Sequence, residues 1–222
     1  MYETVLFDVD DTLCTYRRDA AAVLEEAFAA VGVEPFFEAS AYHDRYAAFV
    51  DETDGIDDLR RECFAAIAAD AGREADLGRA VADAFAHERD HANVEPLPGA
   101  LEAVETLAAN HRVGVVTNGA PEMQVAKLRG LGLTDAFETV VHAGYDARAK
   151  PHPEPFERAL DALDTPADRA VHVGNSLSSD VAGAHAAGVA SAWLDAGTAP
   201  DPTPTYTLSS MGDLTRPPWR RG

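Results

Sequence analysis

After Gly99 the chain alternates between helical patterns and short apolar runs. The helical patterns cover 99–110, 121–130, 153–163 and 179–187, and the strand-like runs cover 112–117, 137–141, 170–174 and 190–194. This alternation is typical of a parallel sheet whose connecting helices pack on its faces. An earlier apolar run, Thr4–Val9, has the composition of a further buried strand. The sequence therefore predicts an α/β fold with a Rossmann-like parallel sheet as its core.

Between the first predicted strand and Gly99 the pattern is helical only. Four segments, 17–31, 37–53, 57–71 and 74–91, are rich in Ala, Glu, Arg and Leu, and glycine-containing turn signals separate them. We therefore expect an α-helical domain over 16–94, inserted into a core formed by 1–15 and 95–222. The end of the chain is expected to be a surface tail, because it contains Pro200, Pro202, Pro204, Pro217 and Pro218.

The chain is strongly acidic. Asp and Glu number 38 against 18 Lys and Arg, which gives a formal net charge of -20. Such a surface repels nucleic-acid phosphates and anionic lipids, so neither is an expected partner. Only two of the basic residues are lysines, Lys127 and Lys150. Many acids, many alanines and few lysines resemble the composition of halophilic proteins, and an acidic mesophilic protein is the alternative.

The sequence also predicts a cytoplasmic protein. No apolar run reaches the roughly 18 residues that a membrane helix needs, and the first residues show no basic stretch of the kind that opens a secretory signal. Cys14 and Cys63 are expected to be reduced thiols, since two cysteines do not make a disulfide framework. The oligomeric state is left open.

Four polar clusters lie at the ends of predicted strands or just beyond them. They are Asp8-Val9-Asp10-Asp11-Thr12-Leu13, Thr117-Asn118-Gly119, Lys150-Pro151 and Gly174-Asn175-Ser176-Leu177-Ser178-Ser179-Asp180. The carboxyl ends of parallel strands meet at one edge of the sheet, where sites of such folds lie. Each cluster alone is compatible with a helix cap, a turn or a solvated loop. Together they predict one site.

This set of residues resembles the haloacid dehalogenase-like hydrolase superfamily, in the branch with a helical cap inserted after the first strand. The Asp8-x-Asp10-x-Thr12-Leu13 string is the most specific part, and the resemblance covers nearly all of the chain before its last twenty residues or so. It implies a Mg²⁺-dependent phosphatase that hydrolyses a small phosphorylated metabolite, such as a nucleotide or a sugar phosphate.

The resemblance also implies roles for the two aspartates of the first cluster. Asp8 would attack phosphorus and form an aspartyl-phosphate, as carboxylates do in covalent catalysis. Asp10 would protonate the leaving oxygen and then activate water. A spacing of two puts both carboxylates on the same side of an extended strand. Dehalogenases of this superfamily lack the second aspartate, so Asp10 favours phosphate esters; a dehalogenase or phosphonate hydrolase is a minor alternative.

The remaining clusters would bind the phosphoryl group and the metal. By resemblance, Thr117, Asn118 and Gly119 would bind phosphoryl oxygens, and Lys150 would pair with the nucleophile and the phosphate. Mg²⁺ would be held by Asp8, Asp10 through its backbone carbonyl, Asn175 and Asp180, because hard cations take oxygen ligands. The family usually has Asp where this chain has Asn175. This departure leaves a second interpretation open, a catalytically weak or inactive protein that binds a phosphometabolite.

A motif of another class lies in the predicted helical domain. His87-Glu88-Arg89-Asp90-His91 matches the His-Glu-x-x-His string of zinc proteases, in which two histidines four residues apart on a helix hold zinc. The helix is expected to end within a few residues of this string, and a protease would leave the four strand-end clusters unexplained. We therefore favour the phosphatase.

Overall fold

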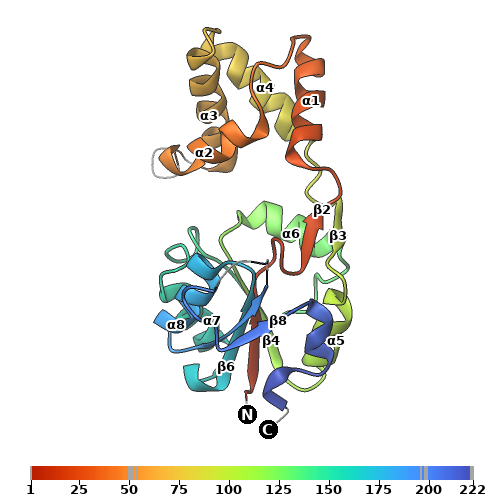
Figure 1. Ribbon diagram of the computed structural model, residues 1–222, viewed down its shortest axis with the longest axis vertical. Coiled ribbons are helices and arrows are strands. Elements are labelled where there is room, and N and C mark those ends of the chain that lie inside the picture. The colour runs from red at the N-terminus through yellow and green to blue at the C-terminus, as the bar shows by residue number, and fades with distance from the viewer. Residues whose placement is uncertain (1, 50–52, 54, 196, 198–199, 221–222) are drawn as a thin grey trace. The chain divides into compact units, whose positions relative to one another are not determined.

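The computed structural model describes residues 2–49, 53, 55–195, 197 and 200–220 (Figure 1). The chain divides into two compact units. One unit combines Met1–Tyr16 with His91–Gly222, and the other is Arg17–Asp90. We call them the core unit and the helical unit and describe each by itself.

The core unit is built on one parallel sheet. Its six strands are β1 (Thr4–Phe7), β4 (Arg112–Thr117), β5 (Thr139–His142), β6 (Ala170–Gly174), β7 (Ala190–Leu194) and β8 (Tyr206–Leu208), in the order β5-β4-β1-β6-β7-β8. Every neighbouring pair is parallel. Phe7, the last residue of β1, pairs with Val115 on one side and Val173 on the other. The predicted α/β fold with a parallel sheet is therefore confirmed.

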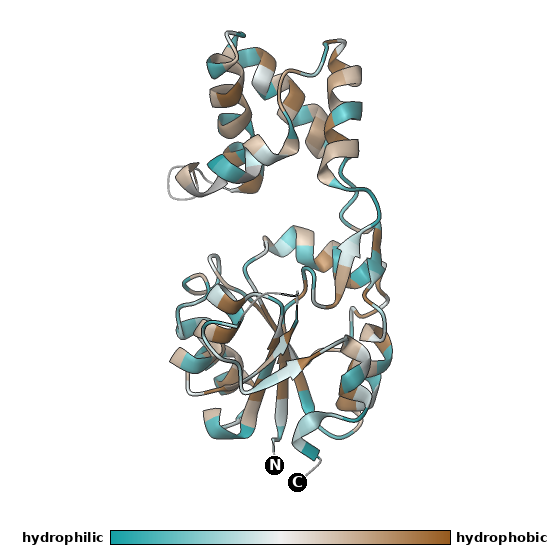
Figure 2. Cartoon of the chain, viewed as in Figure 1, coloured by the Kyte–Doolittle hydropathy of each residue, from teal (hydrophilic) through white to brown (hydrophobic). Residues whose placement is uncertain are grey.

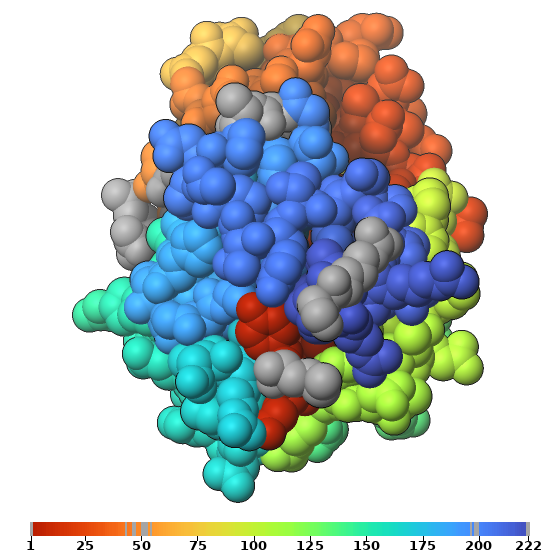
Figure 3. Space-filling model, turned by 60° about the horizontal axis from the view of Figure 1, so that its bottom comes forward, coloured from red at the N-terminus to blue at the C-terminus, as the bar shows by residue number. Residues whose placement is uncertain are grey.

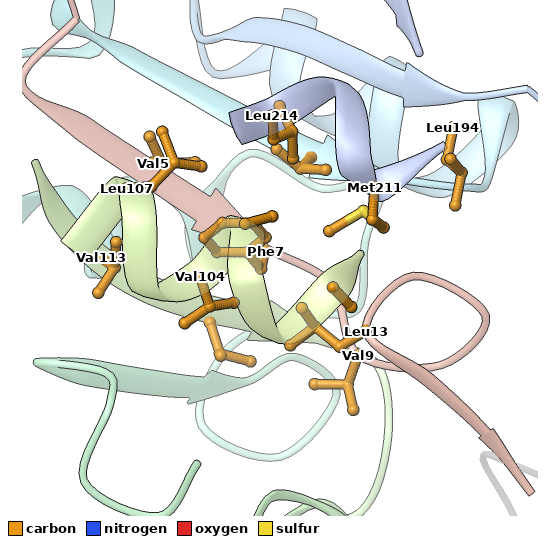
Figure 4. Packing of buried hydrophobic residues seen from close by; sticks show 14 of the residues in the cluster. Val5, Phe7, Val9, Leu13, Val104, Leu107, Val113, Leu194, Met211 and Leu214 are labelled. Atoms are coloured by element: carbon orange, nitrogen blue, oxygen red, sulfur yellow. The ribbon is translucent and has the colours of Figure 1, made fainter. Parts of the chain in front are cut away.

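Successive residues of β1 enter two different hydrophobic clusters, as the alternation of a strand requires. Val5 and Phe7 pack with α5 (Ala100–Ala108) and the C-terminal segment, and Figure 4 shows them beside Val104 and Leu107. Leu6 packs on the other face, against α7 (Glu154–Ala162) and α8 (Ala182–Ala186). Burial on both faces explains why every β1 residue after Thr4 is apolar.

The C-terminal segment corrects one expectation, because it is part of the core and not a surface tail. Tyr206–Leu208 forms β8 at the edge of the sheet, beside β7. Leu208, Met211 and Leu214 are at most 1% exposed. The dark blue C-terminal segment meets the red start of the chain at the surface (Figure 3). The Tyr206 hydroxyl lies 3.3 Å from that of Tyr2. This strand was not predicted from the sequence, because the prolines on either side of it indicated an irregular segment.

Two short strands mark the chain's passage between the units. β2 (Cys14–Tyr16) pairs antiparallel with β3 (Val94–Pro96), so the two connections run side by side. Neither strand was expected from the sequence. After β4, the helix α6 (Pro121–Gly130) follows. After β6, a π-helical turn, Leu177–Val181, leads directly into α8.

The helical unit contains α1 (Ala20–Val31), α2 (Ala39–Phe49), α3 (Ile56–Asp70) and α4 (Ala75–Glu88). Asp19 caps α1, since its side chain accepts a hydrogen bond from the Ala22 amide at 2.7 Å. The helices carry apolar and polar residues side by side (Figure 2) and enclose a core that includes Phe28, Phe64 and Phe85. The predicted end of the second helix, residues 50–52, lies outside the described residues. Among the described residues, no helix is long and apolar enough to cross a membrane.

Candidate active site

Two aspartates and a lysine form a buried cluster at the carboxyl ends of β1 and β6. The Lys150 Nζ donates to Asp8 Oδ1 at 2.8 Å, to Asp180 Oδ1 at 2.6 Å and to the Val116 carbonyl at 2.8 Å. Lys150 is 5% exposed, Asp8 7% and Asp180 2%. A buried ammonium needs such partners, because an unpaired charge in the interior is very costly. The polar clusters that begin at Asp8, Lys150 and Gly174 thus meet.

Asp180 is held more firmly than Asp8. Besides Lys150, the Asp180 carboxylate accepts hydrogen bonds from the Ser176 amide at 3.0 Å and pairs with His172 Nε2 at 3.0 Å. Gly174 makes room for it, since a Cβ at that position would lie 2.4 Å from the Asp180 Cγ. Asp8 has Lys150 as its ion-pair partner. Asp180 therefore holds Lys150 in place, and Lys150 in turn supplies the positive charge that pairs with Asp8.

The pKa values follow this difference. Burial raises the pKa of Asp8 to about 7, because Lys150 only partly offsets the loss of water and Asp180 adds a second negative charge. Burial would also raise the pKa of Asp180, but Lys150 and His172 outweigh it and hold that pKa well below its usual range. Burial lowers the pKa of His172. For Lys150 the carboxylates outweigh burial and raise the pKa.

Asp10 lies in a different environment. Its side chain is 46% exposed, whereas the side chain of its ion-pair partner Lys127 is only 2% exposed. Gln124 Nε2 donates to Asp10 Oδ2 at 2.7 Å, and the Lys127 ammonium pairs with Oδ1. The Tyr16 ring lies 4.8 Å from Lys127 Nζ. Asp10 and Tyr16 outweigh the effect of burial and raise the pKa of Lys127.

The Thr117-Asn118-Gly119 cluster follows β4, and its residues have different partners. Both polar atoms of the Asn118 amide bind the main chain of Lys150, with Oδ1 accepting from its amide at 2.8 Å and Nδ2 donating to its carbonyl at 3.1 Å. Thr117 is buried and its Oγ1 accepts from the Gly119 amide at 3.2 Å. Gly119 lies against Gln124. Asn118 thus fixes the loop that presents Lys150, while Thr117 has a hydroxyl proton to donate.

Asn175 joins the first and the last clusters. Its side-chain Oδ1 accepts a long hydrogen bond from the Thr12 hydroxyl at 3.4 Å, and its carbonyl accepts from the Trp193 indole at 2.9 Å. Asn175 is partly buried. The amide oxygen therefore lies at the same edge of the sheet as Asp8, and the long hydrogen bond from Thr12 is its contact among the described residues.

The side chains and carbonyl at this edge offer the type of ligand atom that a hard cation prefers. Asp8, Asn175, Asp180 and the Asp10 carbonyl all offer oxygen, the ligand type that Mg²⁺ prefers. Lys150 takes one oxygen of each buried carboxylate. Among the described residues, no group of three or more His, Cys, Asp or Glu side chains is placed to hold a metal ion. Besides the carboxylates of Asp8 and Asp180, a divalent cation here would depend on Asn175, a backbone carbonyl and water.

The His-Glu-x-x-His string does not form the helical pair that zinc proteases use. α4 ends at Glu88, and Arg89 already has extended backbone, so His91 lies beyond the helix that carries His87. His91 Nδ1 instead lies 2.6 Å from the Tyr16 hydroxyl. His87 belongs to the helical unit and His91 to the core unit.

Sequence reasoning missed three residues around the predicted aspartates: His172, Gln124 and Lys127. His172 stands out as a polar residue inside the apolar run 170–174, and this was a usable signal. Lys127 is one of only two lysines in the chain. Gln124 offers no signal of its own, since a glutamine on a helix is ordinary.

Comparison with known proteins agrees with this geometry. The haloacid dehalogenase-like hydrolase family matches residues 2–188. A phosphoserine phosphatase of Thermus thermophilus is 32% identical, over 95% of each chain. A 2-haloacid dehalogenase structure from Pseudomonas syringae is 30% identical over 100% of each chain, with a TM-score of 0.70. The Bacillus subtilis hydrolase YfnB has a TM-score of 0.79 at 24% identity, over 97% of each chain. The chain is a hydrolase and belongs to the haloacid dehalogenase-like family.

Proposed function

We propose that the protein is a phosphatase that hydrolyses a small phosphate monoester through a phosphorylated Asp8. The observation that carries this proposal is the pair of aspartates two residues apart in different environments. Asp8 is buried against Lys150, and the side chain of Asp10 is half exposed. A nucleophile and a general acid or base need such separate environments. The relative from Thermus thermophilus, a phosphoserine phosphatase, supports the same reaction class.

The nucleophile would be the Asp8 carboxylate. Attack on phosphorus forms a new bond from a carboxylate oxygen and breaks the bond to the leaving oxygen, which takes a proton from Asp10. In the second half, Asp10 accepts a proton from water, which attacks phosphorus and frees Asp8. Lys150 would remain paired with Asp180 throughout, so its positive charge stays beside the transferring phosphoryl group.

The phosphoryl oxygens would be bound at the end of β4 and by Lys150. The buried Thr117 hydroxyl accepts from the Gly119 amide through a lone pair and would donate its own proton to a phosphoryl oxygen. Asn118 would act mainly through the Lys150 main chain, which its amide binds from both sides. Fixed donors cost no reorganisation when charge develops on the phosphoryl group.

Mg²⁺ is the proposed cofactor, held by Asp8, the Asp10 carbonyl, Asn175 and Asp180. When bound, it would neutralise negative charge between the nucleophile and the phosphoryl group. The helical unit, Arg17–Asp90, is proposed to act as a cap that supplies contacts to the leaving group and excludes water. A small phosphorylated metabolite is the proposed substrate class.

Dehalogenation is the second candidate, favoured by the 30% identity to the dehalogenase of Pseudomonas syringae. A departing halide needs no proton, so a dehalogenase has no use for a general acid beside its nucleophile. This chain nevertheless binds Asp10 through both carboxylate oxygens. A carboxylate held by two side chains has a use in ester hydrolysis, where the leaving oxygen needs a proton, and we therefore favour that reaction.

The test is a substrate panel on the purified protein with and without Mg²⁺. It contains p-nitrophenyl phosphate, phosphoserine, sugar phosphates and nucleoside monophosphates, and 2-chloropropionate with halide detection. We expect Mg²⁺-dependent phosphate release that Asp8→Asn abolishes and Asp161→Asn, an exposed carboxyl on α7, leaves unchanged. Halide release without phosphate release would favour the dehalogenase. Phosphate binding without any turnover would favour a non-catalytic binding protein.

A further inference from the structure

The two lysines of this chain lie in the same kind of environment. Lys150 is buried against Asp8, and Lys127, on α6, is 1% exposed and paired with Asp10. The chain has 18 basic residues, so 16 of them are arginines. Each lysine therefore pairs with one of the two aspartates of the Asp8-x-Asp10 string. Lys150 has a proposed role in binding the phosphoryl group, whereas Lys127 has no role in the mechanism described so far.

Burying Lys127 is expensive unless its charge has a function or a strong partner. An ammonium moved out of water costs several kcal/mol in real proteins, on the order of what a good ion pair returns. Its carboxylate partner, Asp10, keeps 46% of its side chain exposed. A half-exposed carboxylate does not need a buried lysine to be stable, since water already solvates it. The pair is therefore built to hold Asp10 in place.

Gln124 gives a second, independent sign. It is 0% exposed, and its Nε2 donates to Asp10 Oδ2 at 2.7 Å. Its Oε1 is buried and has no hydrogen-bond partner among the described residues. An unpaired buried oxygen costs about 1–3 kcal/mol. The fold tolerates this cost at a residue whose side chain, among the described residues, makes its hydrogen bond to Asp10.

Gly119 makes the arrangement possible. A Cβ on residue 119 would lie 1.6 Å from Gln124 Nε2 and 2.6 Å from its Cδ, so any side chain there displaces the amide. Gly119 also belongs to the cluster predicted to bind phosphate. The structure gives this glycine a further role, since it leaves the space in which Gln124 reaches Asp10.

We infer that Gln124 and Lys127, which we call the Asp10 clamp, are positioning residues for the general acid and base. The inference rests on the proposed function. The clamp binds both carboxylate oxygens from the α6 side, which fixes the carboxyl group where it can reach the leaving oxygen and later the attacking water. A misplacement of about 1 Å can cost on the order of 10²-fold in rate. Positioning of this carboxyl therefore matters for both halves of the reaction.

The test compares substrates whose leaving groups need different amounts of protonation. An alkyl phosphate needs a proton on its leaving oxygen, whereas 2,4-dinitrophenyl phosphate loses a stable anion without one. For Lys127→Met and Gln124→Leu we expect kcat/KM on the alkyl phosphate to fall by about 10²-fold. On the dinitrophenyl ester, kcat/KM should stay within about threefold of the wild-type value, because attack by Asp8 is untouched.

The second half of the reaction gives a further readout. Activation of water by Asp10 does not depend on the leaving group, so kcat on the dinitrophenyl ester should fall although kcat/KM does not. A burst of dinitrophenolate should then precede the slow steady state. Gly119→Ala should reproduce the Gln124→Leu pattern. Arg129→Met is the matched control, since it removes an exposed positive charge from the same helix and should change neither parameter.

Several results would overturn the inference. One is an equal loss of kcat/KM on both esters, which indicates a general structural defect. Another is wild-type kinetics in both clamp variants. If Lys127→Met does not fold, Gln124→Leu decides alone, because it keeps the ion pair and removes only the amide. Failure of the proposed function is distinguishable, since the wild-type protein would then hydrolyse neither ester.

Discussion

The nucleophile proposed here should destabilise the metal-free protein at neutral pH. Burial raises the pKa of Asp8 from its ordinary 3.8 to about 7 in the folded chain. The favourable contribution of Asp8 is therefore complete below pH 3.8 and is lost as the pH rises through about 7. A difference of about three pH units, at about 1.4 kcal/mol each, corresponds to about 4 kcal/mol. Roughly 2–3 kcal/mol of this loss falls between pH 5 and pH 8.

Asp8→Asn removes the titration and keeps the shape of the side chain. Lys150 retains Asp180 and the Val116 carbonyl in the variant, so its charge stays paired. We therefore expect the free energy of unfolding of the wild type to fall relative to Asp8→Asn by about 2–3 kcal/mol from pH 5 to pH 8, in EDTA. At pH 8 the variant should be the more stable protein.

Urea unfolding followed by tryptophan fluorescence measures this difference in the right part of the molecule. Both tryptophans, Trp193 and Trp219, belong to the core unit, so the signal reports that unit alone. Asp161→Asn, with an exposed carboxyl, is the control and should follow the wild type at each pH. Parallel pH profiles for the wild type and Asp8→Asn would refute the reasoning that burial governs the ionisation of Asp8.

Three further predictions concern other parts of the molecule. Asn175→Asp adds a charge to the proposed metal shell and should lower the Mg²⁺ concentration for half-maximal binding, measured by calorimetry; an unchanged value excludes residue 175 as a ligand. Leu214→Ala should cost about 2–5 kcal/mol in urea unfolding, since Leu214 is 0% exposed; a cost near zero would contradict the burial of the C-terminal segment. Because salt screens the repulsion that a net charge of -20 creates, the melting temperature should increase when KCl is raised from 0.05 to 3 M. An unchanged melting temperature would argue against a halophilic protein.

The sheet and the buried cluster could be predicted because their signals are local in the sequence. β1, β4 and β6 are buried on both faces, so each is a mostly apolar run, although β6 contains His172. Polar residues directly after such runs must lie at the carboxyl edge of the sheet. That rule predicts one site for the clusters that contain Lys150 and Asp180, about 140 and 170 residues from Asp8, and the pairing of Lys150 with Asp8 was expected from the family resemblance.

The remaining elements depend on contacts that no local pattern reveals. β2, β3 and β8 have three residues each, too few for a period of two to be recognised. Their pairing partners lie elsewhere in the chain, so their strand structure follows from tertiary contacts. The contact of the Asp10 clamp with Asp10 could not be predicted from the sequence for a related reason. On a helix, the spacing of Gln124 and Lys127 describes a common face, and only the fold brings that face to Asp10.

A covalent phosphoryl group on Asp8 tests the central claim most directly. The Asp10→Asn variant should accumulate it, because p-nitrophenyl phosphate needs little protonation to react and the variant lacks the base that activates water. After acid quench during turnover with Mg²⁺, peptide mass spectrometry should find one phosphoryl group on Asp8, removable by hydroxylamine as an acyl phosphate is. Turnover with the phosphoryl group on another residue, or wild-type turnover by Asp8→Asn, would contradict the account.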